Sequence, residues 1–74
     1  MTKQNYTDEE RRHWTVTFEV AGLDGQTVGR MIFRSGTAER IAPCREIVWN
    51  NIAQGTMSPF DLEDTLEAHF RVAT

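Results

Sequence analysis

The side chains in this sequence with the clearest chemical potential are one thiol and two imidazoles. Cys44 follows Pro43 near a candidate helix start, where the positive end of the helix dipole lowers a thiol pKa and favours a nucleophile. His13 and His69 are the imidazoles that would join it around zinc. Their spacing contains no Cys-x-x-Cys or His-x₃-His pair, and Cys44 also lies on an apolar stripe, where a free cysteine is usually a small core residue. The sequence therefore predicts no metal site and no catalytic cysteine.

Other catalytic arrangements are equally weak. No paired carboxylates, glycine-rich phosphate loop or Ser/His/Asp set rises above chance in these 74 residues. A core of this size also leaves little room for a substrate pocket. We therefore expect a non-catalytic protein without a cofactor.

Arginine makes up seven of the eight basic residues, and it suits both nucleic-acid and protein interfaces. Arg30 and Arg34 share one face of a predicted strand, with Arg40 and Arg45 further along the chain. Such a patch indicates nucleic-acid binding. The net charge of −3 argues against it, because nucleic-acid binders carry an excess of positive charge. Nucleic-acid binding is therefore the alternative function.

The excess negative charge lies in the C-terminal segment, residues 56–74, where four carboxylates face only Arg71. An acidic helix face is either a solvated surface or a surface directed at a basic partner. Trp49 is either a filler at the edge of the core or an exposed anchor of the kind enriched at interfaces. The predicted partner-binding residues are Glu63, Asp64, Glu67, Trp49, Arg30 and Arg34.

Two strands and a turn are predicted for the N-terminal half. Trp14, Val16, Phe18 and Val20 alternate with polar residues, which is the period of a half-buried strand. The Asp24-Gly25 pair favours a hairpin turn, and a second strand follows over residues 26–34. Before the hairpin, residues 1–12 form a polar arm or one short helical turn, because Thr7-Asp8-Glu9-Glu10 has a capping-box pattern.

Two helices are predicted for the C-terminal half. Apolar residues recur at helical spacing from Ile41 to Ile52, so the first helix begins either near Thr37 or at Pro43 and ends at Gly55. Ser58-Pro59 is the start signal of the second helix. Residues 70–72 form either the end of that helix or a short third strand.

The expected fold class is therefore α+β: a small antiparallel β-hairpin, with or without a short third C-terminal strand, packed against two α-helices. The chain is too short for more than one domain, so residues 1–74 form a single unit. The predicted core consists of Trp14, Val16, Phe18, Met31, Phe33, Ile41, Val48, Ile52, Leu62 and Leu66.

Cysteine usage and hydropathy set the expected location. A single cysteine excludes an intramolecular disulfide and favours a reducing compartment. Residues 1–12 have no apolar signal region, and no segment approaches the roughly 20 apolar residues of a spanning helix. We expect a cytoplasmic protein with no membrane partner.

The segment from Trp14 to Gly55, with Val28-Gly29-Arg30 in the second strand and a capped helix after it, resembles small phage-encoded anti-CRISPR inhibitors. The resemblance covers about half the chain, contains no diagnostic motif and transfers no functional residue. It implies a phage or bacterial protein that occupies a nucleic-acid-binding or assembly surface on a host complex. The expected function is thus that of a small non-catalytic protein-binding domain, and the resemblance implies a phage or mobile-element inhibitor that blocks a host nucleic-acid-binding complex.

Self-association is also expected. The predicted strand Trp14–Val20 is long and free of proline and lysine, so it lacks the usual devices that block edge-to-edge pairing. A homodimer through this edge strand would cover it. Alternatively, Glu19, the N-terminal turn or the 70–72 segment protects the same edge within one chain.

Overall fold

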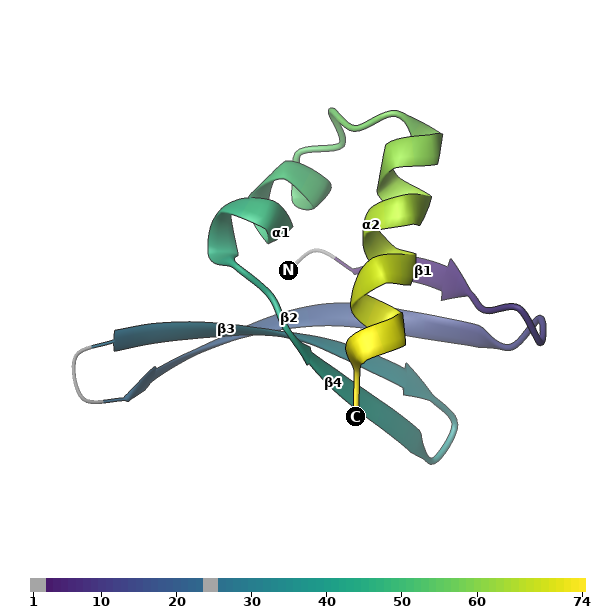
Figure 1. Ribbon diagram of the computed structural model, residues 1–74, viewed down its shortest axis with the longest axis horizontal. Coiled ribbons are helices and arrows are strands. Elements are labelled where there is room, and N and C mark those ends of the chain that lie inside the picture. The colour runs from purple at the N-terminus through teal and green to yellow at the C-terminus, as the bar shows by residue number, and fades with distance from the viewer. Residues whose placement is uncertain (1–2, 24–25) are drawn as a thin grey trace.

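A computed structural model describes residues 3–23 and 26–74 of the chain. Four antiparallel strands form one sheet in sequence order, β1 to β4, and two helices follow. Both helices lie on the same side of the sheet, which leaves its other face open (Figure 1). The elements are β1 Gln4–Thr7, β2 His13–Leu23, β3 Gln26–Ser35, β4 Ala38–Pro43, α1 Glu46–Ala53 and α2 Pro59–Val72.

The expected fold is therefore wrong: two helices are present, but they pack on a four-stranded antiparallel sheet and not on a hairpin with or without one C-terminal strand. The expected hairpin is the central pair β2–β3, in which Val16 lies opposite Phe33 and Phe18 opposite Met31. The Asp24-Gly25 turn lies outside the described residues, but Leu23 and Gln26 on either side of it are partners. The two additional strands are N-terminal and central in the sequence, and neither is the C-terminal strand that was considered.

The first additional strand is β1, which lies within residues 1–12, where a polar arm or one short helical turn was expected. Tyr6 pairs with Trp14, and the connection closes through hydrogen bonds from Arg11 N to Asp8 O (3.0 Å) and from Asp8 N to Arg12 O (3.1 Å). Arg11 has a φ of 65°, the left-handed residue of a three-residue hairpin loop. The capping-box reading failed because an aspartate that accepts nearby backbone N–H groups also favours turns.

The second additional strand is β4, which replaces the start of the expected first helix. Gly36, with a φ of 59°, supplies the left-handed conformation for the tight β3–β4 turn. Ile41 then lies opposite Ile32 on the open face of the sheet, so its place on a helical stripe was wrong. Pro43 ends the strand, where a missing N–H costs little, and α1 begins only at Glu46.

The helix boundaries after this point are as the sequence predicts. Gly55, with a φ of 70°, follows the end of α1 as a left-handed cap. Ser58 caps α2 by accepting a hydrogen bond from Asp61 N at 3.2 Å, and Pro59 is the first helical residue. Residues 70–72 continue the helix, so the strand alternative is wrong. Neither helix in the described part of the chain has the length and apolar character to cross a bilayer.

Both edges of the sheet are partly covered within the chain. β1 pairs with residues 13–16 of β2, so that half of the expected edge strand is interior. At the opposite edge, Thr74 exchanges backbone hydrogen bonds with Ile41 of β4, at 2.9 and 3.0 Å. Within the described residues, the rest of β2 pairs only with β3. Homodimerisation through that remaining stretch stays a prediction.

The core lies between the sheet and the helices. Trp14, Val16, Met31, Phe33, Ile52 and Leu66 are buried there as predicted. The predicted core residues Phe18, Val48 and Leu62 are only partly buried at its margin, and Ile41 lies outside it. The core residues that the prediction missed are Tyr6, Ala42 and Ala73. Cys44, which the sequence favoured as a small core residue, and Trp49, whose role it left open, also belong to the core.

Candidate functional site

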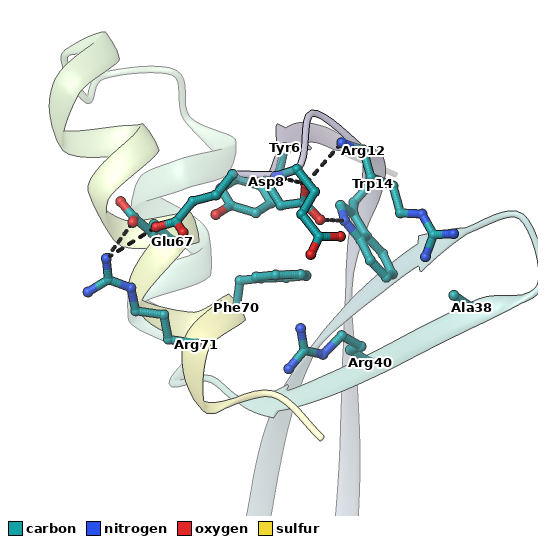
Figure 2. A pocket seen from close by; sticks show the side chains of 11 residues that line it. Tyr6, Asp8, Arg12, Trp14, Ala38, Arg40, Glu67, Phe70 and Arg71 are labelled. Carbon is teal, nitrogen blue, oxygen red and sulfur yellow. Dashed lines mark hydrogen bonds and ion pairs between the residues drawn. The ribbon is translucent and has the colours of Figure 1, made fainter.

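A cleft of about 540 Å³ lies between the β1–β2 loop, β4 and the C-terminal half of α2. We call it the aromatic cleft (Figure 2). Its size falls within the range of sites that accept a ligand or an anchoring side chain. Its lining residues are Tyr6, Asp8, Glu9, Glu10, Arg12, Trp14, Ala38, Arg40, Glu67, Phe70 and Arg71.

Phe70 is the centre of the cleft, and three other rings surround it. The centroids of Tyr6 and Trp14 lie 5.1 and 5.2 Å from that of Phe70. Phe33 packs against it edge-on from the sheet, at 5.2 Å and 74°. Tilted and edge-to-face rings at this spacing stabilise one another beyond the area they bury. The floor of the cleft is therefore aromatic and apolar.

Asp8 builds the wall formed by the β1–β2 loop. Its Oδ2 accepts a hydrogen bond from Trp14 Nε1 at 3.0 Å, and its Oδ1 accepts from the backbone N–H groups of Glu10 and Arg12, each at 2.9 Å. The bond from Trp14, followed by that from the Arg12 backbone, holds the pKa of the Asp8 carboxyl below its ordinary value. Asp8 therefore ties the loop to the cleft floor as a carboxylate.

This role of Asp8 predicts a dependence of stability on pH. Its pKa is lower in the folded than in the unfolded chain, so its contribution is complete above about pH 4 and is lost as the pH falls through the folded value. Asp8→Asn removes that linkage. The gap in unfolding free energy between wild type and Asp8→Asn is expected to shrink from pH 6 to pH 3 in urea denaturation. A gap that is constant with pH would contradict this role.

Three arginines surround the floor, and each is held differently. Arg40 Nη2 donates a hydrogen bond to Ala73 O at 3.0 Å, and its Cζ lies 4.4 Å from the Phe70 centroid. Arg71 pairs with Glu67 at 2.7 Å and approaches Glu9 at 4.0 Å. Arg12 lies over Trp14, with its Cζ 5.6 Å from the ring centroid. Figure 2 shows Arg40 and Arg71 on different sides of Phe70.

The Tyr6 hydroxyl group stays protonated beside these groups. Burial raises the pKa of Tyr6 above its ordinary value, and the carboxylates of Glu67, Asp8 and Glu9 raise it further. A neutral hydroxyl is a hydrogen-bond donor. The cleft thus combines an aromatic floor with hydroxyl and guanidinium donors and a carboxylate rim, which is the composition of a recognition site.

Of the three predicted acidic helix residues, one lines this cleft. Glu67 is one of its lining residues, and Glu63 lines a smaller hollow between α2 and β1. Asp64 is exposed on the same helix. The β1–β2 loop adds Glu9 and Glu10. We call these five carboxylates, Glu9, Glu10, Glu63, Asp64 and Glu67, the acidic face; the sequence shows no link between its two halves.

Trp49 belongs to the core. It is 7% exposed, and its ring stacks on that of Phe18 with centroids 5.5 Å apart and an interplanar angle of 10°. The sequence left two roles open for Trp49, and the structure shows that it packs in the core. Trp49 is therefore not an exposed interface anchor.

The arginines of the expected basic patch are not brought together. Arg30 and Arg34 lie on the open face of the sheet, on either side of Ile32, which is only 5% exposed. Arg34 forms an ion pair with Glu39 on the neighbouring strand, at 2.8 Å. Arg40 points to the opposite, helix-covered side and lines the aromatic cleft. Two arginines thus remain on the open face, and one of them is neutralised.

The thiol and the two imidazoles do not come together at one site either. His13 Nδ1 lies 3.0 Å from Thr7 Oγ1 at one end of the sheet, whereas His69 bonds Thr65 O on α2. Cys44 and His69 line a second hollow, next to the start of α1. Burial raises the pKa of the Cys44 thiol, although a hydrogen bond from the Trp49 backbone opposes this. No group of three or more metal-binding side chains comes together in residues 3–23 and 26–74.

The aromatic cleft was not predicted, although some of its parts carry sequence signals. The acidic run Asp8-Glu9-Glu10 was read as a helix start, and Arg40 was assigned to a basic patch. Tyr6 sits in a segment too short for its alternation to be recognised. Phe70 at helical spacing from Leu66 was the one available indication that the end of α2 faces the core.

Comparison with known proteins adds no relative: no protein family matches this chain, and searches of curated proteins and of solved structures gave no match. The function is therefore argued from the geometry of the site.

Proposed function

We propose that this chain is a small non-catalytic protein-binding domain, and that its acidic face contacts a basic surface of the partner. The observation that supports this most is the convergence of carboxylates from two distant segments. Glu9 in the β1–β2 loop and Glu67 on α2 both approach the one cation Arg71. Glu63 and Asp64 form no ion pair within the described residues. Uncompensated charge of one sign attracts a partner of the other sign.

A surface that binds nucleic acid is one basic surface of this kind. An acidic domain that occupies it would exclude the nucleic acid by charge complementarity. We therefore propose an inhibitory role, in agreement with the resemblance to anti-CRISPR-type inhibitors of phage origin. A cytoplasmic location fits this role, because Cys44 is a free thiol.

Direct nucleic-acid binding remains the alternative function. Its candidate surface is the open face of the sheet with Arg30 and Arg34. The ion pair of Arg34 with Glu39 and the position of Arg40 on the other side count against it. A polyanion approaching the acidic face would also be repelled.

Charge reversal on each face separates the two functions. Glu63→Lys with Asp64→Lys is expected to weaken capture of a protein partner from nuclease-treated bacterial lysate by about tenfold or more, since like charges now oppose each other. Arg30→Glu with Arg34→Glu is the matched control and should leave capture unchanged. Because Arg34, Glu63 and Asp64 are exposed and Arg30 is only half-buried, thermal unfolding of both variants should stay close to wild type.

The inverse ranking would contradict the proposal. If the arginine variant loses binding and the acidic variant keeps it, and if nuclease treatment abolishes capture, the domain binds nucleic acid. The binding should then also fall steeply with salt.

A further inference from the structure

We propose that the aromatic cleft is a receptor for a single carboxylate side chain of the partner protein, and that Arg40 is the residue that binds it. This inference rests on the proposed protein-binding function and assigns the cleft a ligand. The partner segment would carry an aspartate or glutamate flanked by basic residues.

Arg40 is already held in the geometry of a receptor. One of its N–H groups is fixed by Ala73 O, and its guanidinium lies over Phe70. The side chain is half-buried, so the fold has already restricted its rotamers. A donor that is fixed before binding loses less entropy on binding than a mobile arginine does. Its remaining N–H donors are available to a planar acceptor such as a carboxylate.

The other charged groups of the cleft leave this position to a ligand. The oxygens of Asp8 accept hydrogen bonds from the loop backbone and from Trp14 Nε1, and Glu67 pairs with Arg71. Among the described residues no carboxylate lies within 4.0 Å of the Arg40 guanidinium. Figure 2 shows Arg40 beside the floor formed by Phe70 and Trp14, away from the Arg71–Glu67 pair. The Arg40 guanidinium is thus held in place by the fold and forms no ion pair with a described carboxylate.

The rim determines which anion fits. The lining contains three arginines, and its four carboxylates are Asp8, Glu9, Glu10 and Glu67. A polyanion such as DNA would meet these carboxylates as well as Arg40, and would be repelled. A single carboxylate flanked by lysines or arginines would pair with Arg40, and its basic neighbours would pair with the rim carboxylates. The charge pattern therefore favours a mixed-charge protein segment.

The experiment uses two short peptides as probes, an acetylated and amidated Lys-Glu-Lys tripeptide and its Lys-Gln-Lys counterpart. Both are titrated into the ¹⁵N-labelled full chain while the Trp14 Nε1–H and Arg40 Nε–H resonances are followed by NMR. The glutamate peptide is expected to shift both resonances and to bind about threefold or more tighter than the glutamine peptide, because a charge-assisted hydrogen bond is lost in the latter.

Variants of the arginines test the assignment. Arg40→Gln should remove the preference for the glutamate peptide. Arg45→Gln should keep it, because Arg45 lies at the start of α1 and lines the second hollow, not the aromatic cleft. If Arg40→Gln does not fold, Arg40→Lys keeps the charge and loses the planar fork, so the preference should fall but not vanish.

Two results would overturn the proposal: equal binding of the two peptides by the wild-type chain, or a 12-base-pair DNA duplex that shifts the same resonances at lower concentration than the glutamate peptide. The peptide titration needs no natural partner. The peptide titration can therefore contradict the role of Arg40 while the charge-reversal test on Glu63 and Asp64 supports the proposed function. The opposite pair of results is also possible.

Discussion

Gly29→Ala is expected to destabilise the fold by about 3 kcal/mol or more, which is a large part of the total stability of a domain of this size. A Cβ atom at this position would lie 2.2 Å from Cys44 O and 2.6 Å from Phe18 Cζ. The first of these atoms belongs to the backbone. It cannot move away alone, because Cys44 N also donates a hydrogen bond to Gly29 O at 3.0 Å.

The consequence reaches beyond β3. The chain leaves the sheet at Pro43 and crosses Gly29 on its way to α1, so the close approach positions the first helix. A methyl group there forces either the crossing segment or the Phe18 ring, which stacks on Trp49, out of place. Loss of stability should therefore be accompanied by a change in the environment of Trp49, visible as a shift of its Nε1–H resonance by NMR.

Gly36→Ala is the matched control for this prediction. Nothing lies within 4 Å of a Cβ at Gly36, and only its φ of 59° disfavours alanine, at about 1 kcal/mol. Urea denaturation of the two variants measures the difference. Similar losses for both would mean that the crossing at Gly29 has room to relax.

Phe70→Ala is the second change with a large expected effect, a loss of about 3 kcal/mol. Its ring contacts those of Tyr6, Trp14 and Phe33, and it lies under the Arg40 guanidinium. The truncation would remove the centre of an aromatic cluster that joins α2 to three strands. A partly buried ring costs less than a fully enclosed one, which is why the estimate lies at the lower end for phenylalanine.

Phe60→Ala provides the comparison within the same helix. Phe60 is 83% exposed, so its removal should change the free energy of unfolding by no more than about 0.5 kcal/mol. Thermal or urea unfolding of both variants gives the ranking. If Phe60→Ala proved as costly as Phe70→Ala, the end of α2 would not be anchored as described.

The central hairpin and the helix ends could be read from the sequence, because local physical chemistry decides them. Alternation from Trp14 to Phe18 makes one face apolar, and a strand is the only element that buries that face. Ser58, Pro59 and Gly55 mark helix ends through backbone geometry that depends on the residue and its neighbours alone. These features need no distant contact to be favourable.

The strand conformation of β1 and β4 depends on tertiary contacts, so it could not be predicted from local sequence. Gln4–Thr7 has four residues and one buried side chain, and it is a strand because Trp14 and its neighbours offer a pairing edge. In Ala38–Pro43 the apolar residues fit a helical stripe as well as a strand. Pairing with β3 decided for the strand, since it satisfies the backbone of the whole segment and leaves proline at the end.

For function, the sequence by itself determined the charge of the C-terminal helix, the single thiol and the lack of a recognisable catalytic motif. Only the tertiary structure decided which charges act together. It placed Arg40 on the side of the sheet opposite Arg30 and Arg34, and it brought Glu9 to within 4.0 Å of Arg71, 62 positions later (71 − 9). Composition sums charges along the chain, but binding depends on their distances in space, and those distances follow from the pairing of β1 with β2 and the packing of α2 on the sheet.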